Sequence, residues 1–136
     1  MNEQIASTYT TLTLTLLRIV AGFLFMPHGA QKLLGWLGGM GGTGASASFP
    51  DLIWIAGVLE FFGGLCILLG AWTRPVAFLL SGMMAAAYFM GHASQGFWPL
   101  VNRGELAVLY CFVFLFLAAA GGGPLTVERR WRKQAR

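Results

Sequence analysis

Charged residues are scarce in this sequence. Only 10% of its 136 residues are charged, whereas 57% are hydrophobic. A soluble domain usually carries about 25% charged residues, because its surface must stay hydrated. The deficit argues against an ordinary soluble enzyme and indicates a chain whose solvent is largely a lipid bilayer. The 19 glycines agree with this interpretation, because glycine is more frequent in membrane helices than in soluble ones.

Sequence motifs for redox cofactors and metals are also lacking. The two cysteines, Cys66 and Cys111, lie in apolar segments and form neither a CxxC pair nor a zinc-ligand spacing. The sequence has no haem-attachment, iron–sulfur or flavin-binding fingerprint, and we predict no metal site. Residues 1–10 contain no basic side chain, and the apolar run after them is too long for a signal peptide. We therefore expect this run to stay in the mature protein.

What the sequence does have is long apolar runs, at about residues 11–34, 52–71, 76–90 and 106–120. A helix needs about 20 residues to cross the hydrocarbon core of a bilayer. The first two runs are long enough, and the other two need their flanks or a thin bilayer. We therefore predict an all-α protein with a single domain, residues 1–136, in which four transmembrane helices form a bundle.

The basic residues are concentrated after the last apolar run. The tail, residues 126–136, contains Arg129, Arg130, Arg132, Lys133 and Arg136. Positively charged flanks stay in the cytoplasm, so we predict that both ends of the chain face inward across a bacterial inner membrane. We expect the tail to bind lipid headgroups rather than nucleic acid.

Two ionisable residues fall inside the predicted membrane helices. Each costs about 2.5–3.5 kcal/mol at the bilayer centre, so such residues are rare unless they are paired or used. Arg18 lies about 10 Å from the inner face and Glu60 about 12 Å from the outer face, on a rise of 1.5 Å per residue. A long arginine side chain can largely close the remaining gap. We predict an Arg18–Glu60 ion pair, which is either a structural clamp or a site where the carboxyl group carries a proton.

A second group of polar residues is predicted near the outer boundary. In the segment "MPHGAQKLLGW", His28, Gln31 and Lys32 share one helical face because they are spaced i, i+3 and i+4. These side chains either anchor the helix at the interface or line a site. The end of the third run adds His92 at the same level.

The start of the fourth run adds Arg103 and Glu105 to this level. Glu105 has a local alternative, because Asn102 and Glu105 have the spacing of a capping box. With the histidines, Gln31 and Lys32, these residues predict a polar pocket at the outer leaflet. In this pocket His28 and Glu105 are the candidate proton-exchanging groups, and Gln31, Lys32, His92 and Arg103 are the candidate ligand-binding groups.

Three segments together resemble the DoxX family of small four-helix bacterial membrane proteins. They are "LRIVAGFLFMPHGAQKLLG", "GVLEFFGGLCILLGAWTRPVA" and "NRGELAVLYCFVFLFLAAAGGGPLTVER". One branch of the family is the membrane subunit of a thiosulfate:quinone oxidoreductase, and other members associate with soluble redox enzymes. Carried over by motif, the resemblance implicates six residues: Arg18, His28, Lys32, Glu60, Arg74 and Glu105.

These observations favour a redox-linked membrane subunit, part of a quinone-linked oxidoreductase, that holds a quinone near the outer leaflet. His28 or Glu105 would exchange the protons of the ring, Lys32 would orient a ring oxygen, and the Arg18–Glu60 pair would form the floor. One alternative is a non-catalytic scaffold whose basic tail recruits a soluble redox partner protein. Another is a small-solute transporter that works as a homo-oligomer.

Overall fold

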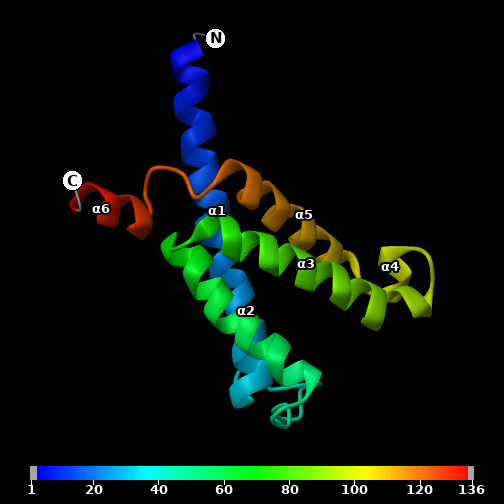
Figure 1. Ribbon diagram of the computed structural model, residues 1–136. Coiled ribbons are helices and arrows are strands. Elements are labelled where there is room, and N and C mark those ends of the chain that lie inside the picture. Colours follow the sequence, from blue (N-terminus) through cyan, green and yellow to red (C-terminus); the bar gives the residue numbers. More distant parts are fainter. Residues whose placement is uncertain (1–2, 135–136) are drawn as a thin grey trace.

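The computed structural model describes residues 3–134 and is helical throughout its regular structure (Figure 1). The helices are α1 Glu3–Leu34, α2 Leu52–Leu69, α3 Thr73–Gly91, α4 Pro99–Asn102, α5 Glu105–Ala120 and α6 Val127–Gln134, with a short 3₁₀ turn at Ala93–Gln95. The all-α prediction is confirmed. Helices α1, α2 and α3 are long and apolar enough to cross a membrane, whereas α5, with 16 residues, is shorter.

The helix ends have local causes. The side chain of Asp51 accepts a hydrogen bond from the backbone N–H of Trp54 at 2.8 Å, which caps the start of α2. Gly70 ends α2 in the left-handed conformation, with φ of 72°. Helix α1 begins at Glu3, well before the expected residue 11, and continues through Pro27.

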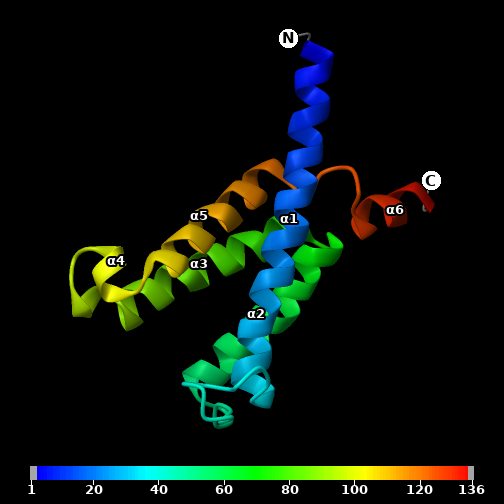
Figure 2. The ribbon, with the colours of Figure 1, turned by 180° about the vertical axis from the view of Figure 1, so that it is seen from behind.

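The four main helices form two antiparallel pairs. Helix α1 packs along α2, and α3 packs along α5. Only residues 70–72 separate α2 from α3, so the two pairs are joined at that end. They diverge away from this junction (Figures 1 and 2). Helix α6, which the sequence predicted as part of a tail, lies beside the same junction.

Glycines of α1 allow its close approach to α2. A Cβ atom added at Gly22 would meet the backbone of Leu68, and one added at Gly29 would meet the backbone nitrogen of Phe61. Gly64 of α2 faces the backbone of Met26 in the same way. Lipid does not drive helices together as water does, so packing at such small residues stabilises the pair.

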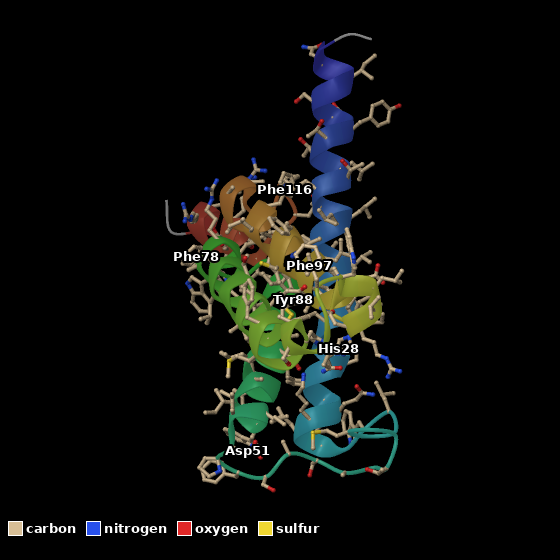
Figure 3. The ribbon with its side chains drawn as sticks, turned by 90° about the vertical axis from the view of Figure 1, so that its right-hand side faces the viewer. His28, Asp51, Phe78, Tyr88, Phe97 and Phe116 are labelled. Atoms are coloured by element: carbon tan, nitrogen blue, oxygen red, sulfur yellow. The ribbon has the colours of Figure 1, made fainter. Side chains whose placement is uncertain are left out.

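The core lies where the two pairs meet. Phe25 of α1, Ile67 of α2, Leu80 of α3 and two residues of α5, Phe114 and Leu117, are almost fully buried there. By contrast, large apolar side chains cover the outside of the molecule. Phe78, Phe97 and Phe116 are examples, with at least half of each residue exposed (Figure 3). Such an apolar surface suits contact with the acyl chains of a bilayer.

Candidate functional site

Polar side chains from both helix pairs surround one small cavity with a volume of about 230 Å³. Its lining comes from α1, α2, α3, α5 and the segment between α3 and α5: Phe25, His28, Lys32, Glu60, Met84, Ala87, His92, Arg103, Leu106, Ala107 and Tyr110. His28 lies on α1 beside the end of α3 (Figure 3). Residues that are up to 85 positions apart in the sequence, as Phe25 and Tyr110 are, therefore share one cavity.

Lys32 and Glu60 form an ion pair across the α1–α2 interface. Lys32 Nζ lies 2.5 Å from each carboxylate oxygen of Glu60. The side chain of Glu60 is 5% exposed and that of Lys32 is 26% exposed. Gly57, almost one turn before Glu60, leaves room for the Lys32 stem, because a Cβ there would press on the Cβ of Lys32. The pair compensates a carboxylate that would be costly to bury alone.

The predicted Arg18–Glu60 ion pair is wrong. Arg18 is 1% exposed, and its guanidinium donates to four backbone carbonyls, those of Ile67, Leu68, Gly122 and Leu125. The pairing of α1 with α2 sets Arg18 beside the last turn of α2, about 10 Å along the helix axis from Glu60. Carbonyls at a helix C-terminus lack partners within the helix and carry the negative end of its dipole, so they can satisfy a cation.

Arg18 therefore belongs to the fold and does not form the floor of the cavity. Two of its acceptors lie at the end of α2, and the other two, Gly122 and Leu125, lie in the segment between α5 and α6. One side chain of α1 thus holds the end of the first helix pair and the end of the second together.

One wall of the cavity is aromatic. The rings of His28 and Tyr110 lie 6.4 Å apart at 80°, and Phe25 lies 4.9 Å from Tyr110. Among residues 3–134, neither the His28 ring nor the Tyr110 hydroxyl group has a hydrogen-bond partner. Both groups can therefore bond to a ligand.

The segment between α3 and α5 forms the rim. His92 Nδ1 lies 3.0 Å from the backbone oxygen of Asn102, and the ring of His92 stacks on Tyr88. Asn102 is 1% exposed, and its side chain accepts from the N–H of Gly104 at 2.8 Å. This buried amide orders the short α4 and leaves the next residue, Arg103, exposed at the rim.

Two predicted site residues lie outside the cavity. Gln31 donates through its side chain to the backbone oxygen of Leu37 at 3.2 Å, so it holds the loop after α1. Glu105 is exposed in the first turn of α5 and lines a neighbouring, open hollow that shares Arg103 and Leu106 with the cavity. Asn102 ends α4 instead of capping α5, so the capping box with Glu105 is not formed.

Tyr110 is the cavity residue that the sequence prediction missed. Helix α5 is apolar on all sides, so its periodicity does not reveal which face is buried. The available signal was the phenol itself, because Tyr110 is the only side chain with an oxygen between Leu106 and Ala120.

The geometry suits a small, ring-sized ligand. A cavity of about 230 Å³ is smaller than the roughly 300–1,000 Å³ usual for drug-sized ligands. The His28 ring and the Tyr110 hydroxyl group line it together with the Phe25 ring and the Lys32–Glu60 ion pair. Over residues 3–134, no three His, Cys, Asp or Glu side chains gather as a metal site would require.

Comparisons with known proteins show which family this chain resembles. The profile of the family described as DoxX matches residues 13–93, which carry His28, Lys32, Glu60 and His92. An uncharacterized protein of Haemophilus influenzae is 39% identical over 129 residues, covering 93% of this chain and 96% of the relative. The Escherichia coli protein named "Inner membrane protein YqjF" is 29% identical over 119 residues, covering 86% and 90%. No solved structure matches the chain significantly.

Proposed function

The chain belongs to the DoxX family of membrane proteins, and from that membership we propose that it is the quinone-binding membrane subunit of a redox system. It is an inner-membrane protein, as is the relative that bears this description in its name, and three of its helices suit a membrane span. A soluble partner enzyme supplies two electrons to the quinone, and the cavity supplies the two protons that complete a quinol.

The observation that supports a quinone is that the His28 ring and the Tyr110 hydroxyl group line the cavity and have no hydrogen-bond partner within residues 3–134. A quinone ring carries two carbonyl oxygens, each of which needs a hydrogen-bond donor when it is reduced. The His28 ring and the Tyr110 hydroxyl group fill that role. Lys32 has three N–H donors and uses two on Glu60, so one remains to orient a ring oxygen.

The same proposal includes four membrane crossings with both ends in the cytoplasm. Arg74 and four basic residues of α6 lie at the junction end of the helix pairs, and positive charge of this kind stays inside. Helix α5 is about 24 Å long, shorter than a core of about 30 Å. It crosses where the bilayer is locally thin.

Quinone binding by purified protein tests this function. We expect wild type to bind ubiquinone-1, measured by quenching of the protein's tryptophan fluorescence. His28→Ala and Tyr110→Phe should each weaken this binding up to about tenfold, the effect of one lost hydrogen bond. Glu105→Gln is the matched control, because it changes a polar group near the rim but outside the cavity. Equal affinity in all four proteins, or no binding by wild type, contradicts the proposal.

One observation also supports the scaffold alternative. Helix α6 presents four basic side chains, Arg129, Arg130, Arg132 and Lys133, all of them exposed. A helix with such a charge is suited to an acidic partner protein. Deleting residues 127–136 would abolish partner recruitment if this alternative holds. If the chain binds quinone in the cavity, which no residue of α6 lines, that binding would persist in the same deletion.

A further inference from the structure

A second hollow, with a volume of about 570 Å³, lies between α6 and the end of α2. Its two sides differ in chemistry. One side is apolar and the other is basic: Leu69, Leu125 and Val127, facing Arg129, Arg130 and Lys133. Among the described residues that line it, none is acidic. The hollow therefore combines positive charge with apolar surface, which is unusual for a surface exposed only to water.

Contacts with residues 70–73 hold helix α6, one wall of this hollow, in place. The N–H of Glu128 donates to the backbone oxygen of Gly70 at 3.3 Å, and its carboxylate accepts from the N–H of Thr73 at 3.3 Å. The Thr126 hydroxyl accepts from the N–H of Arg129 at 3.2 Å and caps the helix. The Trp131 ring lies 5.8 Å from that of Trp72. A ligand would thus meet a pre-ordered site, which lowers the entropy cost of binding.

The apolar side of the hollow continues the surface of a membrane helix. Leu69 is the last residue of α2 and is 49% exposed, and Leu125 is 68% exposed. The basic side chains stand beyond the end of α2, where that helix leaves the hydrocarbon. A ligand that fits both sides must carry an anionic group at the membrane surface and an apolar part that enters the bilayer.

We propose that this hollow, independent of the quinone cavity, is a binding site for one anionic phospholipid. Arg129, Arg130 and Lys133 bind the phosphate through charge-assisted hydrogen bonds, for which guanidinium groups are well suited. Leu69 and Leu125 contact the glycerol and the first methylene groups of the acyl chains. The site distinguishes lipids by charge and position, whereas a disordered basic tail attracts any anionic surface.

The position of the basic residues provides a matched test. Arg130 and Lys133 line the hollow, whereas Arg74 and Arg132 lie at the same end of the molecule outside it. Arg132 lies 3.5 Å from Glu128, and Arg74 donates to the backbone oxygen of Ala120. The double variants Arg130→Gln/Lys133→Gln and Arg74→Gln/Arg132→Gln therefore lose the same charge from the same end.

The experiment is native mass spectrometry of the delipidated full chain with phosphatidylglycerol or phosphatidylcholine of identical acyl chains. We expect one phosphatidylglycerol to bind wild type more tightly than phosphatidylcholine. Arg130→Gln/Lys133→Gln should weaken that binding about thirtyfold, from the usual effect of two basic residues at an anionic surface. The second double variant should change it less than about threefold. Circular dichroism of each variant checks that it is folded.

Two further arms identify the ligand. Leu125→Asn should weaken the binding of both lipids, because it removes apolar contact and no charge. Glycerol 3-phosphate, which carries the phosphate without acyl chains, should not displace the lipid. The proposal is overturned if the two double variants lose affinity equally, if the two lipids bind equally, or if glycerol 3-phosphate competes.

Discussion

At the residue scale, two cations of α1 are satisfied in different ways. Lys32 pairs with one carboxylate, and Arg18 donates to four backbone carbonyls. The planar guanidinium suits Arg18, because it directs several donors at once toward acceptors from two segments. Glu60 therefore depends on Lys32 alone for its counter-charge among the described residues.

Double-mutant cycles should separate these two arrangements. Lys32→Met and Glu60→Leu each leave an uncompensated charge, and each should destabilise the protein by about 3 kcal/mol. The double variant should lose much less than the sum. Arg18→Met combined with Glu60→Leu should be additive to within about 0.5 kcal/mol, because the groups do not touch. Unfolding in mixed detergent and SDS, followed by circular dichroism, measures both cycles. Stronger coupling of Glu60 to Arg18 than to Lys32 would refute the Lys32–Glu60 ion pair.

At the scale of the elements, the α1–α2 contact depends on the absence of side chains. Gly22 and Gly29 lie seven residues apart, two turns along one face of α1, and both touch the backbone of α2. This contact also sets Lys32 opposite Glu60 and Arg18 opposite the end of α2. The partners of Lys32 and Arg18 therefore follow from how closely these two helices approach.

Gly29→Ala should separate α1 from α2. Overpacking of this kind costs about 1–3 kcal/mol, and it should also weaken quinone binding by moving Lys32. Gly82→Ala on α3 is the control, because a Cβ there meets nothing within 4 Å. Alanine is the better helix former by about 1 kcal/mol, so this variant should be unchanged or slightly more stable. The same detergent unfolding assay compares the two, and equal stability would exclude the close contact.

At the scale of the whole molecule, the basic residues are concentrated at one end. Basic residues gather at the junction of the two helix pairs, and the loop between α1 and α2, next to Asp51, lies at the opposite end (Figures 1 and 3). The cavity lined by His28 and Tyr110 lies between these ends, and the proposed lipid site lies at the basic end. The two sites therefore lie at different levels along the helices.

Labelling of single cysteines should reveal this orientation. In a chain with Cys66→Ala and Cys111→Ala, Thr43→Cys should react with an impermeant maleimide in cells whose outer membrane is permeable. Gln134→Cys should react only after the inner membrane is opened. Both positions are exposed, so access depends on the side of the membrane alone. The opposite pattern would reverse the proposed topology and place the quinone cavity near the inner leaflet.

Much of the helical structure could be predicted from the sequence, because a long apolar run leaves the backbone no partner but itself in a bilayer. The start of α2 at Leu52 and the end of α5 at Ala120 agree with the runs that predict them. The polar pocket was predicted in part, since the depth of His28, Lys32 and His92 follows from counting residues along helices. Depth does not show which way a side chain points, so counting residues could not show that Glu105 lies outside the cavity.

The sequence by itself determined that this chain is an all-α membrane protein with polar residues at two levels and a basic end. Those properties depend on composition and on local periodicity. Only the tertiary structure decided that Glu60 pairs with Lys32, that Arg18 binds carbonyls, that Tyr110 lines the cavity and that α6 docks beside α2. These contacts depend on the rotation and offset of one helix against another, which close backbone packing sets and which no single segment encodes.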